Sequence, residues 1–142
     1  MSSTDPIEIA TRSLRHHDRS RSELDERLAK AGVGAAERAE ALDRLEQVGY
    51  VDDGRYAATR AASLASRGQG DAAIRFDLRG RGLDSQAVEA ALATIAPEAD
   101  RAAALVERLG RSASTAARLR RKGFSAEAVE GAFGDGFAAT AT

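Results

Sequence analysis

The stretch that decides the fold runs from Ile74 to Leu83, with the sequence Ile-Arg-Phe-Asp-Leu-Arg-Gly-Arg-Gly-Leu. Ile74 and Leu78 are spaced as on one face of a helix, and a glycine follows at position 82. Glycine takes the left-handed conformation that ends a helix without the cost of about 1 kcal/mol that a Cβ brings. In such a Schellman end the residue after the glycine packs on the side chain five positions earlier, here Leu83 on Leu78. The stretch therefore predicts a helix, a tight corner and a second helix.

This combination of a glycine, an apolar residue and a leucine five positions earlier occurs four times. Three of the corners align as an internal repeat, with offsets of 50 and 41 residues between their glycines. Such offsets are typical of helical repeat arrays, so we predict three tandem units of three helices. The first unit departs at Arg38, where the others have valine. The corners are Leu28 with Gly32 and Val33, Leu45 with Gly49 and Tyr50, Leu78 with Gly82 and Leu83, and Leu119 with Gly123 and Phe124.

The composition and the helix starts favour an all-α fold. Ala, Leu, Arg and Glu dominate the 142 residues, and no stretch alternates apolar and polar residues over the length of a strand. Asp5 before Pro6, and Ser20 with Glu23, are typical helix starts, and Pro97 suits the first turn of another helix. We predict an elongated array of about nine short helices, with units at residues 5–51, 52–96 and 97–134 and a mobile tail at 135–142.

The composition also disfavours several classes of protein. The absence of cysteine excludes disulfides and thiolate metal sites. No apolar run approaches the ~20 residues of a membrane span, and residues 1–6 lack the features of a secretory signal, so we expect a cytoplasmic protein without membrane contact. The net charge of −1 argues against a polycation that coats DNA by charge alone.

No group of residues indicates catalysis. His16 and His17 are adjacent and point to different sides of a helix, which disfavours a metal site. Asp52 and Asp53 are explained as helix caps without a partner base or nucleophile. The glycines on either side of Gln69 lack the Lys and Ser/Thr of a phosphate-binding loop and indicate a hinge or a turn. We therefore expect no catalytic residue, metal or cofactor.

Four segments at or near the corners carry a family resemblance. They are Ser-Arg-Ser-Glu-Leu at 20–24, Gly-Tyr-Val-Asp-Asp-Gly-Arg-Tyr-Ala at 49–57, Arg-Gly-Gln-Gly at 67–70 and Arg-Arg-Lys-Gly-Phe-Ser at 120–125. In this order, over about residues 7–133, they resemble the RecX regulators of bacterial recombination. The resemblance implies a non-enzymatic modulator of DNA repair that binds the RecA–DNA filament and restrains its growth, ATP hydrolysis and strand exchange. It also implies tandem three-helix units, and it carries over no contact residue.

Basic residues of the second and third units are the candidate contacts for such a filament. The planar arginine head suits both the phosphates and the carboxylates that a filament groove offers. The same residues also fit ordinary solvated helix faces, because basic groups near helix C-termini complement the helix dipole. The candidates are Arg67, Arg75, Arg79 and Arg81 on the middle unit, and Arg111, Arg118, Arg120, Arg121 and Lys122 on the last.

Two aromatic residues carry further expectations. Phe76 lies about 200° from Ile74 around the helix, so it faces away from its own core. We expect it to pack against a neighbouring unit, the alternative being exposure to a partner. Tyr56 lies near the start of a helix and is expected to face its own core.

A helix-turn-helix module that binds DNA directly is the alternative function, because short helices joined by glycine corners also occur in such proteins. The near-neutral charge and the lack of a dimerisation helix count against it. We expect a monomer whose contact with single- or double-stranded DNA is weak.

Overall fold

The computed structural model describes residues 5–15 and 17–134, and these residues form nine α-helices with no strand among them. The predicted all-α class is confirmed. His16 and the tail at 135–142 lie outside the described residues, so the predictions made for them stay predictions. The helices are α1 (Pro6–Leu14), α2 (Arg21–Lys30), α3 (Ala35–Gln47), α4 (Asp53–Ser66), α5 (Asp71–Gly80), α6 (Ser85–Leu92), α7 (Glu98–Leu109), α8 (Ala113–Arg121) and α9 (Ala126–Phe133).

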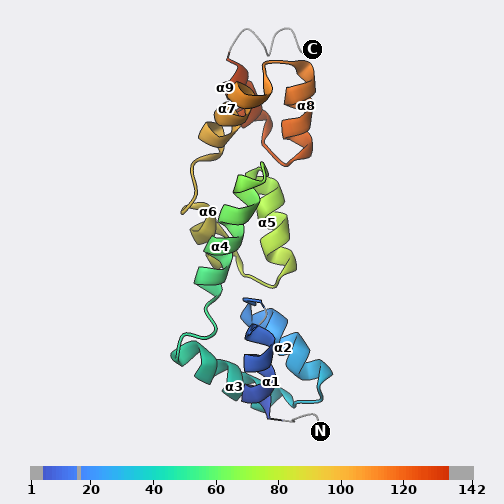
Figure 1. Ribbon diagram of the computed structural model, residues 1–142, viewed down its shortest axis with the longest axis vertical. Coiled ribbons are helices and arrows are strands. Elements are labelled where there is room, and N and C mark those ends of the chain that lie inside the picture. Colours follow the sequence, from blue (N-terminus) through green and yellow to red (C-terminus); the bar gives the residue numbers. More distant parts are fainter. Residues whose placement is uncertain (1–4, 16, 135–142) are drawn as a thin grey trace.

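The helices form a long column of three units (Figure 1). Helices α1–α3 lie at one end of the column, α4–α6 in the middle and α7–α9 at the other end. Within each unit every helix packs against the other two, and each unit has its own buried apolar cluster. The predicted elongated array of three-helix repeats is confirmed. The clusters include Leu24, Leu28 and Leu42 in the first unit, Ile74, Leu78 and Val88 in the second, and Val106, Leu119 and Phe124 in the third.

Glycine corners end the middle helix of each unit, as predicted. Gly82 has a φ of +82°, and the Leu83 amide donates to the Leu78 carbonyl at 3.2 Å. The side chains of Leu78 and Leu83 lie in the same buried cluster. The equivalent bonds are 3.0 Å from Val33 to Leu28 and 3.1 Å from Phe124 to Leu119.

The corner at Gly49 differs from the prediction. The Tyr50 amide donates to the Leu45 carbonyl at 2.9 Å, but the Tyr50 side chain is 59% exposed. Val51, whose amide also bonds to Leu45, is buried in the first core in its place. The apolar contact moves one residue along because the chain runs on in an extended conformation to Asp52, the N-cap of α4. The expectation that Tyr50 packs on Leu45 was wrong.

The helix starts follow the predicted capping chemistry. The Ser20 hydroxyl accepts from the Glu23 amide at 3.0 Å, and the Glu23 carboxylate accepts from the Ser20 amide at 2.9 Å. Asp52 caps α4 through the amide of Arg55 at 3.0 Å. Pro97 differs from its prediction, because it is the N-cap of α7 and the helix begins one residue later.

The first joint, between units one and two, is where α2 begins and α5 ends. The Ser20 hydroxyl is fully buried there and donates to the carbonyl of Arg81 at 2.7 Å. The amide of Arg21 donates to the carboxylate of Asp53, the first residue of α4, at 2.8 Å. Ser22 lies where a Cβ on Gly82 would be, so the two units are in close contact.

The second joint, between units two and three, repeats this arrangement with α5 and α8. Gly70, the N-cap of α5, donates its amide to the carbonyl of Lys122 at 2.9 Å. The amide of Asp71 donates to the carboxylate of Glu98, the first residue of α7, at 2.7 Å. A Cβ on Gly70 would lie less than 3.0 Å from the backbone of Gly123. Of the two alternatives predicted for the glycines around Gln69, a hinge or a turn, the structure shows a turn, and it is packed into a joint.

The two joints place α8, α5 and α2 one after another along the same side of the column (Figure 1). At each joint a carbonyl from a helix C-terminus meets the N-terminal end of the next helix in the row. The negative end of one helix dipole therefore faces the positive end of the next, which is the favourable arrangement. This row of middle helices defines the surface on which most of the candidate contact residues lie.

Candidate interaction surface

Three of the nine candidate contact residues are engaged within the protein. Arg81 bonds to the carboxylate of Asp77 at 2.9 Å and to the hydroxyl of Tyr56 at 3.0 Å, beside the first joint. Arg75 forms a two-pronged bond with Glu89 at 2.9 and 3.0 Å. Arg111 donates to a backbone carbonyl of α9 at 2.9 Å. Their guanidinium groups therefore stabilise the column whatever else they contact.

The remaining six candidates make no side-chain hydrogen bond or salt bridge with any described residue. Four of them lie at the end of α8 and in the corner that follows it, where no acidic residue interrupts the sequence. All are exposed except Lys122, which is half-buried because its backbone lies in the second joint. The six are Arg67, Arg79, Arg118, Arg120, Arg121 and Lys122.

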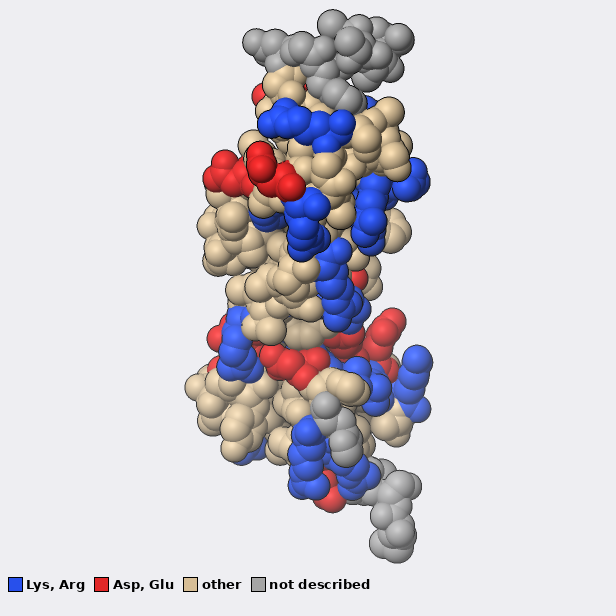
Figure 2. Space-filling view, turned by 45° about the horizontal axis from the view of Figure 1, so that its top comes forward, with Lys and Arg blue, Asp and Glu red and all other residues tan. Residues whose placement is uncertain are grey.

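The basic side chains are unevenly spread over the face shown in Figure 2. Lys and Arg predominate on the upper, C-terminal half of this face, whereas Asp and Glu form a band across the lower half. A net charge of −1 thus conceals a column with a basic end and a mixed end. A ligand with negative charge is attracted to the C-terminal half.

Phe76 is the most exposed large apolar residue of the described chain, with 83% of its surface accessible. It points outward from α5 because Ile74 and Leu78 occupy the buried face of that helix. The expectation that Phe76 packs against a neighbouring unit was wrong, because the units meet end to end at the joints and leave this face of α5 uncovered. The Tyr56 prediction is confirmed, since its ring lies in the core of its own unit.

A shallow hollow borders Phe76 along the outer face of α5. Arg75 and Arg79 lie on this face, and the small residues Ala72 and Gly80 lie one turn before and one turn after the ring. The sequence placed Phe76 on the outward face. It gave no signal that this face would remain open.

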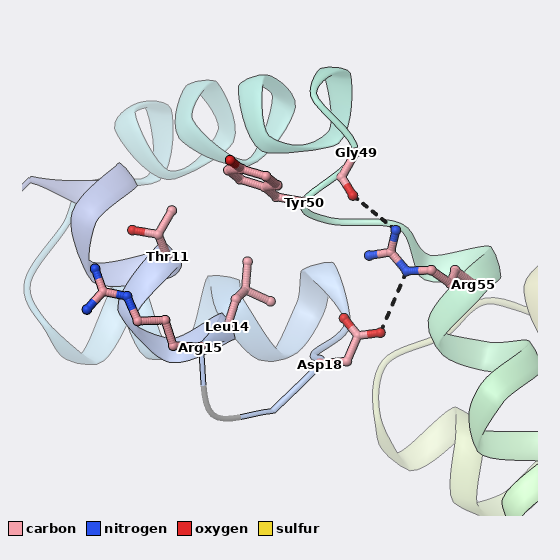
Figure 3. A pocket seen from close by; sticks show the side chains of 7 residues that line it. All are labelled: Thr11, Leu14, Arg15, Asp18, Gly49, Tyr50 and Arg55. Atoms are coloured by element: carbon pink, nitrogen blue, oxygen red, sulfur yellow. Dashed lines mark hydrogen bonds and ion pairs between the residues drawn. The ribbon is translucent and has the colours of Figure 1, made fainter.

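A second hollow, in the first unit, was missed by the sequence analysis (Figure 3). The exposed ring of Tyr50 lies across it from Leu14. Arg55 closes one side by donating to the carbonyl of Gly49 at 3.0 Å, and its guanidinium lies 3.8 Å from the carboxylate of Asp18. The signal in the sequence was the pair of apolar residues after Gly49, where the other corners have one. The lining residues are Thr11, Leu14, Arg15, Asp18, Gly49, Tyr50 and Arg55.

Two carboxylates near the first joint have shifted pKa values of opposite sign. The guanidinium groups of Arg60 and then Arg81 hold the pKa of Asp77 below its ordinary value, against the effect of burial. Burial raises the pKa of Asp53, and the hydrogen bond from the Arg21 amide offsets part of that rise. Both carboxylates bind within the column, but ionisation of Asp77 stabilises the folded state, whereas ionisation of Asp53 carries the cost of a buried charge.

The chemistry of these surfaces favours contact with a macromolecule. Among the residues that the structure describes, no group of three or more His, Cys, Asp or Glu side chains is placed to hold a metal ion. Over the same residues, no helix has the length and apolar character needed to cross a membrane. The candidate surface consists of open hollows, an exposed aromatic ring and unpaired arginines, which are typical of interaction surfaces.

Comparison with known proteins points to one family. The family model described as RecX, second three-helix domain, matches residues 52–92, which cover α4–α6. A regulatory protein RecX from Xanthomonas oryzae pv. oryzae (strain MAFF 311018) is 38% identical over 89 residues, which are 63% of this chain and 56% of that protein. Another from Chromohalobacter salexigens is 40% identical over 98 residues, covering 69% of this chain and 64% of that protein. The matched part of the chain thus spans less than two thirds of these relatives.

Solved structures give the same fold over most of the column. The crystal structure of RecX from Lactobacillus salivarius aligns with a TM-score of 0.75 at 18% identity, covering 96% of this chain and 94% of that chain. A second crystal structure, of a regulatory protein RecX, aligns with a TM-score of 0.71 at 21% identity, covering 87% of this chain and 70% of that chain. The sequence matches and the shared column agree with the resemblance seen at the corners: the chain belongs to the RecX family of regulatory proteins.

Proposed function

We propose that this protein is a non-enzymatic regulator that binds the RecA–DNA filament in the cytoplasm and restrains its ATP hydrolysis and strand exchange. It acts as a monomer in the regulation of DNA repair and recombination. Its units are residues 5–51, 52–96 and 97–134, and each offers a separate contact. In this proposal the protein changes the activity of the recombinase and catalyses no reaction itself.

The single observation that carries the proposal is the column held by two joints of equivalent geometry. Each joint fixes the N-terminus of a middle helix against the glycine corner of the following unit. Cations without an internal hydrogen bond or ion pair, such as Arg79 and Arg120, therefore lie on successive units of one column. A filament presents its binding surfaces at regular intervals along a groove. Contacts linked in a fixed column reinforce one another through effective concentration, so weak single contacts suffice.

The unpaired cations of α8 are the contacts on which we place most weight. Arg118, Arg120 and Arg121 are exposed and carry no internal hydrogen bond or salt bridge within the described chain. A guanidinium group binds phosphate or carboxylate through two parallel hydrogen bonds, so either the DNA or an acidic face of the recombinase is a suitable partner.

The test is inhibition of a bacterial RecA recombinase assembled on single-stranded DNA. We expect the wild-type protein to slow ATP hydrolysis and strand exchange, and the triple variant R118E/R120E/R121E to inhibit at least about tenfold less, because each reversal replaces an attraction with a repulsion. Circular dichroism checks that helicity is unchanged. Absence of any effect of the wild-type protein on recombinases would overturn the proposal.

A second triple variant controls for net charge. R27E/K30E/R44E changes the charge by the same amount in the first unit, where these side chains are exposed, form no salt bridge with described residues and lie outside the hollow beside Tyr50. We expect it to retain most of the inhibition. Titration against bare DNA at increasing salt tests the alternative function, since a protein that reads DNA directly binds it tightly on its own with a steep salt dependence.

A further inference from the structure

The outer face of α5 combines an exposed aromatic ring with a hollow that nothing in the described chain fills. Phe76 is 83% exposed, and the hollow beside it is lined by Ala72, Arg75, Arg79 and Gly80. A phenylalanine ring exposed to water gives up the free energy that burial of its apolar surface would yield. Aromatic residues are enriched where protein surfaces meet, and here the exposed ring stands beside a hollow, which makes this face of α5 a candidate for such a contact.

Gly80 is the second observation, because nothing within the described chain requires a glycine at that position. It is the last residue of α5, it has no left-handed φ, and a Cβ built on it meets no atom within 4 Å. Alanine would therefore fit and would favour the helix. By contrast, Gly82 two residues later needs its positive φ and lies against Ser22. Because no backbone angle or contact within the described chain requires glycine at position 80, the glycine is explained if a partner molecule packs closely against this part of α5, one turn from the exposed ring.

The charges around the ring indicate what approaches. Arg75 is held by Glu89 in a two-pronged bond along one side of the hollow, which fixes that side chain in place. Arg79 has no hydrogen bond or salt bridge to a described residue and is exposed. Its charge acts on Glu89 without a hydrogen bond or ion pair between them, so the guanidinium of Arg79 keeps its donors free for a carboxylate of the incoming molecule.

We propose that the α5 face formed by Phe76, Arg79 and Gly80 docks an acidic protein segment, which buries the Phe76 ring, packs its backbone or a small side chain on Gly80 and pairs a carboxylate with Arg79. The proposal rests on the proposed function, because the segment belongs to the recombinase of the filament. It assigns the middle unit an apolar contact with protein, distinct from the charged contact of α8.

A nucleic acid is the less suitable occupant of this face. Binding to a single strand uses a row of cations along the backbone together with aromatic rings on which successive bases stack. Here one ring stands beside one arginine that forms no hydrogen bond or ion pair, and the other arginine of the hollow, Arg75, is already paired with Glu89. The unpaired cations of α8 lie on the next unit. The face therefore suits a protein segment that brings one apolar group to the Phe76 ring and one carboxylate to Arg79 better than it suits a nucleic acid.

The experiment measures binding of fluorescently labelled protein to RecA filaments on single-stranded DNA. We expect F76A to weaken binding at least about tenfold and R79E to weaken it by a similar factor, as truncated aromatic and arginine anchors of interfaces do. G80A is the sharper test, because we expect it to raise Tm by about 2–4 °C while weakening binding about threefold to tenfold. A substitution that stabilises the fold and weakens binding acts at the interface.

Matched controls separate the possible outcomes. G131A changes another helical glycine with open space around it, in α9, and should raise Tm without affecting binding. V48A truncates another exposed apolar residue and should leave binding unchanged. If F76A and G80A bind filaments as tightly as the wild-type protein does, this inference alone is overturned. If the wild-type protein itself does not bind filaments, the proposed function is overturned as well. If F76A loses as much affinity for bare single-stranded DNA as for filaments, the occupant of this face is a nucleic acid and the proposed protein segment is overturned.

Discussion

The two joints place the same parts together but connect them through different atoms. At the first joint the side chain of Ser20 reaches the carbonyl of Arg81, whereas at the second joint the backbone amide of Gly70 reaches the carbonyl of Lys122. At the second joint the backbones of the two helix ends meet directly because Gly70 has no side chain to separate them. Both joints need a glycine at the contact, but the polar bond comes from a hydroxyl at the first joint and from a backbone amide at the second.

The joints also share a feature that the corners alone do not show. In each, the first residue of the connecting helix uses its carboxylate to cap the first amide of the preceding unit's middle helix. Asp53 does so for Arg21, and Glu98 does so for Asp71. An acidic residue at a helix start is favourable for its own helix, and here it serves a second helix as well. The comparison shows that repeat joints can keep one contact fixed while the adjacent contact changes chemistry.

The largest expected effect comes from adding one methyl group at the second joint. G70A places a Cβ among backbone atoms of Gly123 and Phe124, which have no side-chain freedom with which to yield. We expect it to destabilise the protein by about 2–3 kcal/mol, the upper range for overpacked sites, and to separate units two and three. Urea unfolding measures the loss, and small-angle X-ray scattering detects a change in the length of the column.

G34A is the matched control for this prediction. Gly34 is also a helix N-cap without a side-chain bond, with extended backbone angles similar to those of Gly70, but no backbone atom crowds its Cβ position. We expect G34A to change stability by only a few tenths of a kcal/mol, because glycine and alanine then differ mainly as caps and in chain entropy. Equal losses in the two variants would show that the close approach at Gly70 does not limit the joint.

Sequence reasoning predicted the local parts of this fold and missed the parts that depend on how units meet. The leucine five residues before each apolar corner residue follows from the geometry of one helix end, so Leu78 and Leu83 were predictable as a pair. The bond from Ser20 to Arg81 joins residues far apart in the chain, and no local pattern specifies it. The sequence left a hinge and a turn open at Gln69 for the same reason, since the partner of Gly70 lies in the next unit.

The candidate surface shows the same division between local and long-range information. A helical wheel placed Phe76 on the outer face of α5, but whether a neighbour covers that face depends on the way the joints orient the units. Arg81 matched the other candidates by residue type, although Asp77 and Tyr56 engage it in the structure. The unpaired state of Arg79 likewise became visible only with the positions of its neighbours. Charge in the sequence therefore identified the surface without distinguishing its free side chains.

An intermediate effect is expected from removing the hydroxyl that joins units one and two. S20A loses the cap on the Glu23 amide and also leaves the carbonyl of Arg81 without its buried donor. We expect a loss of about 2 kcal/mol, the sum of a helix cap and a buried hydrogen bond. S112A removes a cap from α8 at an exposed position and should cost about 1 kcal/mol. Thermal unfolding measures both variants, and the extra loss of stability in S20A is the contribution of the hydrogen bond across the joint. Equal losses in S20A and S112A would show that this hydrogen bond does not stabilise the protein.

The smallest expected effect is a pH dependence at the first joint. The pKa of Asp77 is lowered in the folded protein by Arg60 and Arg81, so its carboxylate stabilises the fold above the ordinary aspartate pKa of about 3.9 and loses that contribution as the pH falls through the lower, folded value. The raised pKa of Asp53 acts in the opposite direction, because protonation removes the cost of a buried charge. The two shifts partly cancel in the wild-type protein.

Single substitutions separate these opposing contributions. At pH 7 we expect D77N to be less stable than the wild type by less than about 1 kcal/mol, as is usual for partly exposed ion pairs, and we expect this difference to shrink as the pH falls below about 4. Urea unfolding at several pH values measures it, with E89Q as the control at a more exposed pair. A difference between D77N and wild type that stays constant from pH 7 to about pH 3 would mean that ionisation of Asp77 does not stabilise the joint. The atoms that a Cβ at Gly70 would meet are backbone atoms that do not titrate, so G70A should cost the same at both ends of this pH range.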